Sequence, residues 1–202
     1  SSLAHYRKME SLLEGELGLE PSLESKQIFQ QLIEDKIPVV QDQNKPKYKL
    51  PSPQTSFVVR VQEQEHIIRQ IGNPNCRLLT LVGPGGIGKT RLAIEAANRT
   101  VDQFSEGACF IELSPLFSSE HIIPAIADSL QFKIDVEASN LSPKDQLLDF
   151  LENRSLLLIL DSFEHLIKDA TLVSEIINRA PEVKVLVTSR EHLKLKPEWI
   201  FE

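Results

Sequence analysis

From residue 57 onward, short apolar runs alternate with longer stretches in which apolar residues recur every three or four positions. The apolar runs predict buried strands, and the stretches between them predict amphipathic helices. This alternation is typical of an α/β fold in which a parallel sheet is covered by helices on both faces, in three layers. The predicted strands are 77–82, 108–113, 155–160 and 183–188, a further strand begins around Trp199 and Phe201, and the predicted helices are 63–71, 89–103, 119–130, 143–152 and 170–179.

The part of the chain before residue 57 has a different pattern. Apolar residues recur at near-helical spacing over Leu3–Leu17 and again over Leu23–Ile37, so residues 1–40 are predicted to form a small all-α helical hairpin. Residues 41–56 contain three prolines and show no periodicity, which is typical of a linker. The α/β domain is therefore expected to occupy residues 57–202.

Composition narrows the classes of protein that fit. The net charge of -7 and the sequence pI near 5.3 argue against direct binding to duplex DNA or to an anionic membrane. Cys76 and Cys109 lie far apart without metal-ligand spacing, and the sequence has neither a signal peptide nor an apolar run of membrane-spanning length. We therefore expect a cytoplasmic protein. The chain begins inside a predicted helix and ends just after an apolar trio, so we expect a segment of a longer protein whose α/β domain is incomplete at its C-terminus.

The stretch Gly83–Thr90 joins the first predicted strand to a helix and fits the phosphate-binding pattern G-x-x-x-x-G-K-[ST] in full. Glycines allow successive backbone N–H groups to face a phosphate, and the start of the helix adds its partial positive charge. Lys89 is expected to reach the β and γ phosphates of a nucleotide, and the Thr90 hydroxyl is expected to bind Mg²⁺. A glycine-rich turn without a ligand is the alternative. The predicted nucleotide-binding residues here are Gly83, Pro84, Gly85, Gly86, Ile87, Gly88, Lys89, Thr90 and Arg91.

Asp161 follows the apolar run 155–160 directly. Its carboxylate is therefore expected at the carboxyl end of a buried strand, where open α/β sheets bind ligands. There it could hold a water molecule of the Mg²⁺ shell, and capping of the next helix is the alternative. Residue 162 is Ser, so a strong catalytic base is missing at the obvious place. The direction of the Glu164 side chain cannot be read from the sequence.

Thr188, Ser189 and Arg190 end the next predicted strand. Arg190 could sense a γ phosphate, because a guanidinium there gains energy only when the extra charge is present. Pairing of Arg190 with surface carboxylates is the alternative. The guanine signature N-K-x-D is absent from the sequence, which favours adenine. If the nucleotide is hydrolysed, Lys89, Asp161 and Arg190 are the predicted catalytic residues.

The stretches LLTLVGPGGIGKTRLAIEAA, LLLILDSFEHL and VKVLVTSRE together resemble the STAND class of signal-transducing P-loop ATPases, close to the NB-ARC family, in the form found in large bacterial transcriptional activators. The resemblance runs from about Pro51 to Glu202. It implies that Gly83–Thr90 is the Walker A loop, Asp161 the Walker B acid and Arg190 the sensor arginine. It also implies an ATP or ADP switch in which a lid, a winged helix and a repeat sensor control oligomerisation and transcription.

Two shorter matches belong to the same resemblance. The segment HYRKMESLLEGELGLEPSLESKQIFQQLI resembles the last helices of a bacterial transcriptional activation (BTAD) domain, a TPR-like helical module. The family begins its nucleotide domain with an aromatic-aliphatic-Gly-Arg-Glu motif, and the corresponding sequence here is FVVRV, residues 57–61. The match implies that Val58 and Arg60 contact the nucleotide. Val59 and Val61 replace the family's Gly and Glu, which puts the adenine-side contacts in question.

These observations are compatible with three different functions of the protein. The first is a nucleotide-controlled molecular switch that binds ATP or ADP with Mg²⁺, hydrolyses slowly or not at all, and belongs to a signal-responsive transcriptional regulator. The alternatives are a turnover P-loop ATPase, which Ser162 disfavours, and a protein-interaction scaffold with a vestigial nucleotide site. The expected partners are the nucleotide, further domains of the same chain and other copies of the protein on activation. DNA is expected to be contacted only through other domains, and no membrane is expected as a partner.

Overall fold

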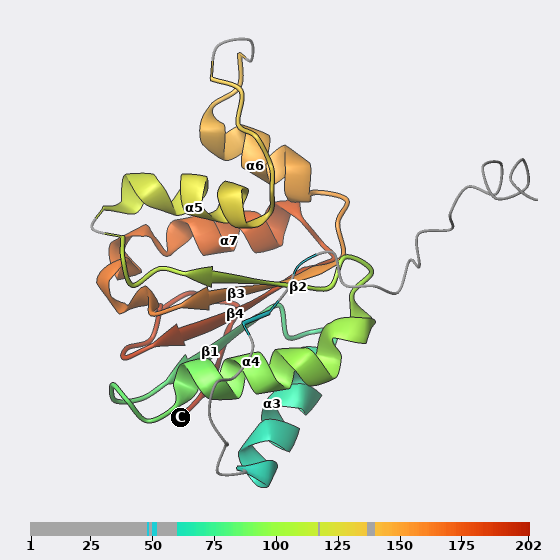
Figure 1. Cartoon of the computed structure of the whole chain (residues 1–202), viewed down its shortest axis with the longest axis vertical. Helices are drawn as coiled ribbons and strands as arrows, with labels where there is room; N and C mark the ends of the chain where they lie inside the picture. The colour runs from blue at the N-terminus through green and yellow to red at the C-terminus, as the bar shows by residue number, and fades with distance from the viewer. Residues whose placement is uncertain (1–47, 49, 52–59, 117, 137–139) are drawn as a thin grey trace, which may run out of the picture. The chain divides into compact units, whose positions relative to one another are not determined.

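A parallel sheet of five strands lies at the centre of the α/β domain (Figure 1). The strands are β1 (Leu78–Val82), β2 (Ala108–Glu112), β3 (Leu156–Asp161), β4 (Val183–Ser189) and β5 (Glu198–Phe201). Their order across the sheet is β2-β3-β4-β1-β5, and every neighbouring pair is parallel. The predicted parallel sheet is confirmed, and the bounds of the predicted strands agree with the observed ones to within one residue.

The structure is a computed structural model, and it describes residues 48, 50–51, 60–116, 118–136 and 140–202. These residues belong to a compact unit that spans Asn44–Glu202. The helical hairpin predicted for residues 1–40 and the nucleotide contact predicted at Val58 lie outside the described residues.

The burial of β3 explains why its sequence is an unbroken apolar run. All of its residues are buried, because helices cover both faces of the sheet. Leu156, Leu158 and Leu160 pack into the hydrophobic core on one face, whereas Leu157 and Ile159 pack into the core on the other face. This alternation also fixes the face on which the polar residue at the end of the strand lies.

The sheet and the helices on its two faces form three layers, as predicted. Figure 1 shows α3 (Val61–Gly72) and α4 (Lys89–Thr100) on one face of the sheet. On the other face lie α5 (Ile122–Ser129), α6 (Pro143–Leu151) and α7 (Thr171–Arg179). α4, α5 and α7 pack against the strands, whereas α3 packs against α4, and α6 packs against α5 and α7. The apolar residues of these helices join those of the strands in the two cores.

Two predicted helices are shorter than their apolar pattern indicates. The helix predicted over residues 89–103 ends at Thr100 and continues as the 3₁₀ turn Val101–Gln103. The helix predicted over residues 119–130 begins as the 3₁₀ turn Ser119–His121 and becomes α-helical at Ile122. Apolar spacing does not distinguish the 3₁₀ hydrogen-bond pattern from the α-helical one over a single turn. The predicted helices therefore included these 3₁₀ turns.

Tyr48 lies within the stretch 41–56 that was predicted to be a linker, yet its side chain is only 5% exposed and belongs to the larger hydrophobic core. This burial raises the pKa of the Tyr48 hydroxyl to about 12. Leu50 packs against the core on the other face of the sheet. The compact unit therefore includes the second part of this stretch, beginning at Asn44.

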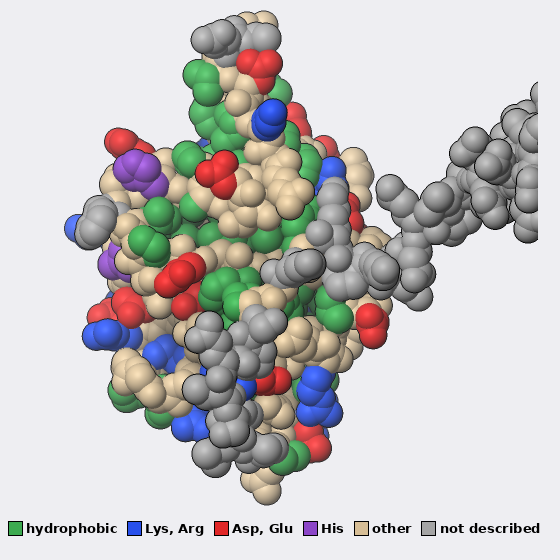
Figure 2. All heavy atoms as spheres, viewed as in Figure 1, with side chains coloured by type: hydrophobic (Ala, Val, Ile, Leu, Met, Phe, Trp, Pro, Cys, Tyr) green, Lys and Arg blue, Asp and Glu red, His purple; other side chains and the backbone are tan. Residues whose placement is uncertain are grey.

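The surface shows mixed charge. Basic and acidic side chains lie interspersed on the face of the molecule seen in Figure 2, and apolar side chains lie between them. Within the described part of the chain, none of the helices has both the length and the apolar character needed to cross a membrane.

Candidate nucleotide-binding site

The loop Gly83–Gly88 connects the end of β1 to the start of α4 (Figure 1). Gly86 and Gly88 have φ angles of 77° and 95°, which lie in the left-handed region that side chains with a Cβ adopt only at a cost. A Cβ at either position would project into open space. The glycines are therefore required by the backbone conformation, and the loop leaves room for a ligand beside the first turn of α4, whose N–H groups have no partners within the helix.

Lys89 is the first residue of α4, and its side chain turns back over the loop. The Nζ atom donates to the carbonyl oxygen of Gly83 at 2.7 Å and to that of Pro84 at 2.9 Å. The ammonium group therefore lies at the loop itself, and its contact with phosphates stays a prediction. Neutral carbonyl oxygens are weaker partners for an ammonium than charged phosphate oxygens, so a phosphate would compete well for this group.

Asp161 lies at the carboxyl end of β3 and is only 5% exposed. Its Oδ1 atom accepts a hydrogen bond from Thr90 Oγ1 at 2.7 Å and another from Thr188 Oγ1 at 2.6 Å. The backbone N–H of Ser162 donates to the same Thr188 hydroxyl at 2.9 Å. The alternative that Asp161 caps the next turn does not fit, because Ser162 occupies the N-cap position and no side-chain cap bond forms there.

The order of the strands explains this contact. β4 lies between β1 and β3, so Thr188 of β4 stands between the loop strand and the strand of Asp161. The backbone N–H of Gly83 also donates to the carbonyl oxygen of Ser189 at 3.3 Å. The end of β4 is thus bonded to both the glycine loop and the acid.

The residues predicted to bind Mg²⁺ have the chemistry that this ion prefers. A threonine hydroxyl and a carboxylate are hard oxygen ligands, and Mg²⁺ usually takes one or two such protein groups together with water and phosphate oxygens. Thr90 and Asp161 are in direct contact, so one ion could bind both. Among the described residues there is no cluster of three His, Cys, Asp or Glu side chains that could hold a metal, so the remaining ligands would come from phosphate and water.

Arg190 follows the last residue of β4 and lies beside the glycine loop. Its Nη2 atom is 3.1 Å from the position that a Cβ on Gly85 would take. Its Nε atom forms an ion pair with Glu164 Oε1 at 3.0 Å, and its side chain is 63% exposed. Both interpretations of Arg190 thus have support in the geometry: it pairs with a surface carboxylate, and it lies where a phosphate on the loop would be close.

The glycine loop, the acid at the end of β3 and the arginine after β4 can now be compared with known proteins. A family model described as the NB-ARC domain matches residues 60–193. This chain belongs to the NB-ARC family. The match covers the loop, Asp161 and Arg190 together, and it confirms the family that the sequence motifs indicated.

Curated relatives of this NB-ARC chain include a putative HTH-type transcriptional regulator of Mycobacterium tuberculosis, which is 37% identical over 123 residues. The match covers 60% of this chain and 13% of that protein, so the chain spans a small part of the relative's length. In solved structures, Cdc6p from Pyrobaculum aerophilum has a TM-score of 0.51 at 18% identity, covering 74% of this chain and 48% of that one. A chain in the structure of Drosophila ORC bound to AT-rich DNA and Cdc6 has a TM-score of 0.50 at 14% identity, covering 70% of this chain and 53% of that one. These likenesses support the α/β fold alone.

Two arginines, Arg60 and Arg91, were also predicted to contact the nucleotide. Arg60 precedes α3 and pairs with Glu63, with 3.4 Å between Nε and Oε2. Arg60 also lines a cavity of about 400 Å³, together with the first residues of α3. Arg91 pairs with Glu95 on the next turn of α4 at 3.1 Å. The nucleotide-binding roles of both arginines stay predictions.

Sequence reasoning missed Glu112, the last residue of β2. Glu112 and Asp161 are register partners on neighbouring parallel strands, and register partners point to the same face of a sheet. The Glu112 carboxylate accepts a hydrogen bond from Ser114 Oγ at 2.9 Å and is exposed. The signal was available in the sequence, because Glu112 interrupts the apolar run 108–113, but the neighbour of Asp161 depends on the order of the strands.

Proposed function

We propose that this chain is the nucleotide-binding module of a signal-responsive transcriptional regulator. In this proposal it binds ATP or ADP with Mg²⁺ and acts as a switch, with slow hydrolysis or none. The observation that carries the proposal is the contact of Thr90 and Asp161 beside a glycine loop that already holds the ammonium group of Lys89. Membership of the NB-ARC family and the printed name of the mycobacterial relative support it.

Different residues of this chain would bind different parts of the nucleotide and its cation. The loop amides and the start of α4 receive phosphate oxygens, and Lys89 exchanges its two carbonyl partners for them. Thr90 and Asp161 hold the cation side of the site. When bound, Mg²⁺ neutralises the charge of adjacent phosphates. Thr188 bonds Asp161 and lies two positions before Arg190, so a change of the ligand at Asp161 reaches the end of β4 through one hydrogen bond.

A switch requires that the nucleotide bind two states of the protein with different affinity. We infer that the wider setting of the module supplies these states: further domains of the same chain, including a BTAD-like module before the domain, and other copies of the protein on activation. DNA would be contacted through other domains, in the cytoplasm. Slow hydrolysis suits this role because rapid turnover would erase the bound state. The absence of an acid at position 162 supports slow turnover.

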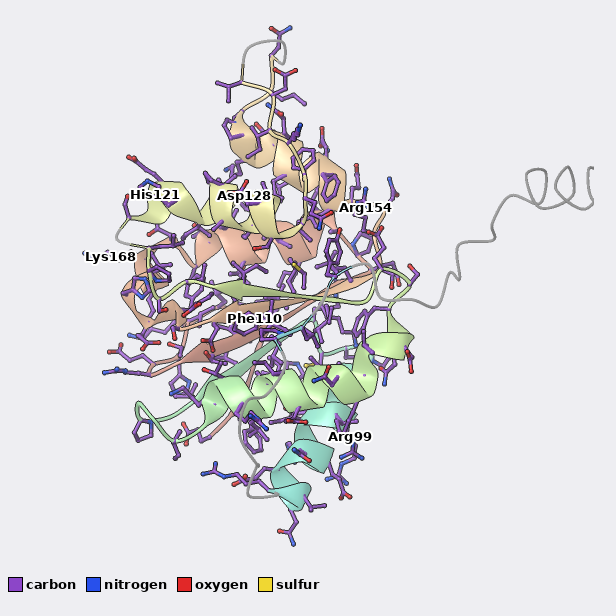
Figure 3. All side chains as sticks on the ribbon, viewed as in Figure 1. Arg99, Phe110, His121, Asp128, Arg154 and Lys168 are labelled. Carbon is purple, nitrogen blue, oxygen red and sulfur yellow. The ribbon has the colours of Figure 1, made fainter. Side chains whose placement is uncertain are left out.

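Calorimetric titration with ADP, in Mg²⁺ and then in EDTA, tests this proposal. We expect the chain to bind ADP in both conditions, and more tightly in Mg²⁺. Asp161→Asn should remove most of the gain from Mg²⁺, because an amide is a poorer ligand for this ion, and should leave binding in EDTA nearly unchanged. Asp128→Asn is a matched control, since Asp128 lies on α5 and is exposed (Figure 3). The absence of heat from the unaltered chain would favour a vestigial site on a scaffold instead.

Turnover ATPase activity is the second candidate function, and Glu112 favours it. A carboxylate beside Asp161 on the neighbouring strand could accept the proton of an attacking water molecule, a role that residue 162 does not fill. General base catalysis contributes about 10²–10⁴-fold to a rate. Glu112→Gln should therefore lower any steady-state ATP hydrolysis at least about tenfold, whereas Glu120→Gln, at an exposed position near α5, should not. Equal rates in both variants would remove Glu112 from the reaction.

A further inference from the structure

The ion pair of Arg190 and Glu164 lies beside the glycine loop. Arg190 leaves the end of β4, and Glu164 lies in the 3₁₀ turn Phe163–His165 that follows β3. The two groups are 3.0 Å apart, and the Glu164 side chain is 27% exposed. The pair therefore links the ends of β3 and β4, the same two strands that the Thr188–Asp161 bond links.

Gly85 gives the pair its position relative to the loop. A Cβ at this residue would lie 3.1 Å from Arg190 Nη2 and 3.3 Å from Cζ, which is closer than ordinary van der Waals contact. The guanidinium thus lies directly against the loop, at a point where a larger residue would push it away. Its position is set by the loop on one side and by the carboxylate of Glu164 on the other.

The turn that carries Glu164 is firmly anchored. Phe163, the residue before it, is only 1% exposed and belongs to the larger core. The carbonyl oxygen of Phe163 accepts a hydrogen bond from Leu166 N at 2.9 Å, which closes the turn. Because its backbone is held at this turn, Glu164 presents its carboxylate to Arg190 at little further entropic cost.

We propose that Glu164 acts as an internal substitute for the terminal phosphate of a nucleotide. Without a third phosphate on the loop, the Glu164 carboxylate holds Arg190. A γ phosphate offers the same guanidinium a more highly charged partner, so it competes with Glu164 for the positive charge of Arg190. Glu164 therefore sets the preference of the site for triphosphate over diphosphate. This inference rests on the proposed function and names a specificity-determining residue for the same site.

The exposure of the Arg190–Glu164 ion pair limits how much Glu164 can change triphosphate affinity. Arg190 is largely exposed, and ion pairs between exposed side chains contribute little to binding or stability. Removal of the competing carboxylate should therefore raise triphosphate affinity by about two- to fivefold. ADP affinity should change by less than about 1.5-fold, because ADP lacks the group that competes for Arg190.

The experiment measures the dissociation constants of ADP and of a non-hydrolysable ATP analogue in Mg²⁺ for the unaltered chain and its variants. Glu164→Gln keeps the size of the side chain and removes its charge. Glu191→Gln is the matched control, because it removes the same charge from the residue next to Arg190, whereas the ion pair of Arg190 is with Glu164. Arg190→Ala and the double variant complete a cycle that isolates the interaction.

We expect Glu164→Gln to raise the ratio of analogue affinity to ADP affinity, Glu191→Gln to leave the ratio nearly unchanged, and the effect of Glu164→Gln to vanish in the Arg190→Ala background. An effect that persists without Arg190 would come from general electrostatic repulsion and would overturn the inference, as would an unchanged or lower ratio. Normal ADP binding in that case would leave the proposed function intact. Binding of neither nucleotide by the unaltered chain would overturn both.

Discussion

The cations at the two ends of the strands are bonded to different parts of the molecule. At the amino ends, Lys184 donates to the carbonyl oxygen of Ile71 at 2.5 Å and to that of Asn73 at 2.6 Å, at the end of α3. Arg77 donates through Nη2 to the carbonyl oxygen of Ala180 at 2.6 Å, just after α7. The last carbonyl groups of a helix have no partners within it and carry partial negative charge. These two cations therefore add hydrogen bonds to carbonyl oxygens at or just after the ends of helices.

At the carboxyl ends, the cations bond groups at the candidate nucleotide-binding site. Lys89 bonds only carbonyl oxygens of its own loop in the described structure, and Arg190 has one exposed ion pair with Glu164. Figure 3 shows the two ends of the sheet: Arg154 lies at the amino ends of the strands, and His121 and Lys168 lie at the carboxyl ends. The amino ends thus use charge to join the ends of helices to the sheet, whereas we propose that the carboxyl ends keep charge available for a ligand.

Substitution of Lys89 is expected to have the strongest effect on nucleotide binding. Lys89→Ala removes the ammonium group from the loop, and loss of a charged partner of this kind costs about 3 kcal/mol, which is a decrease in triphosphate affinity of about a hundredfold or more. The free energy of unfolding, measured with urea, should change by less than about 0.5 kcal/mol. Unchanged affinity would mean that the loop does not bind phosphate.

Arg77 should give the opposite result. Its guanidinium donates to the carbonyl oxygens of Ile177, Ala180 and Val183, and its removal takes one donor from each of these acceptors, although Ala180 O keeps its bond from Val183 N at 3.1 Å. We expect Arg77→Met to lower the free energy of unfolding by about 2 kcal/mol. ADP affinity, measured below the unfolding transition, should not change. A loss of ADP affinity in a fully folded variant would contradict the division of the two ends.

The sequence predicted the parts of the carboxyl end that depend on local pattern. The buried runs, the glycine loop and the acid at position 161 follow from spacing along the chain, and they are where the sequence predicted them. Apolar residues indicate that a strand is buried, but they do not indicate which strand lies beside it. The position of β4 between β1 and β3 therefore had to come from the structure.

The contacts that depend on strand order were not predictable for the same reason. Thr188 was recognised as a polar residue at the end of a strand, but its bond to Asp161 exists only because their strands are neighbours. The direction of Glu164 depends on a 3₁₀ turn and on the buried Phe163, neither of which has a distinctive sequence pattern. At the amino ends, Lys184 looks like an ordinary charged residue within an apolar run.

The pH dependence of stability sharpens the account of the amino ends. Burial raises the pKa of the Cys76 thiol to about 11, although the positive charge of Lys184 opposes this. The folded state therefore keeps a proton that the unfolded state loses above its own pKa of 9.0. The stabilisation is complete below pH 9 and is lost as the pH rises through 11. Between pH 8 and pH 10 the loss from this thiol is about 1 kcal/mol.

Cys76→Ala isolates that contribution. We expect the free energy of unfolding of the variant to fall by about 1 kcal/mol less than that of the unaltered chain between pH 8 and pH 10, while ADP affinity at pH 8 is the same for both. Both proteins retain Cys109, so the titration of that thiol largely cancels in the difference. Parallel pH profiles would show that the thiol does not titrate differently in the folded and unfolded states.

The smallest expected effect concerns Ser162, where the carboxyl end holds a strained residue. Ser162 has φ 63° and ψ 51°, a left-handed conformation that Asn tolerates better than other residues with a Cβ. Its N–H bond to Thr188 does not depend on the side chain. We expect Ser162→Asn to raise the free energy of unfolding by about 0.5 kcal/mol and Ser162→Val to lower it by about 1 kcal/mol, both measured with urea.

Ser162→Asn also tests whether the strained backbone of Ser162 serves the nucleotide-binding site or only the turn. Ser162 Oγ lies 3.4 Å from Asp161 Oδ2, which is a weak contact beside the two threonine bonds to Oδ1. If the backbone alone is at issue, Ser162→Asn stabilises the fold and leaves the Mg²⁺ dependence of ADP binding unchanged. A stabilised variant that loses this dependence would show that the Ser162 hydroxyl helps to orient the acid, because strain that is kept at a ligand site is expected to contribute to its geometry.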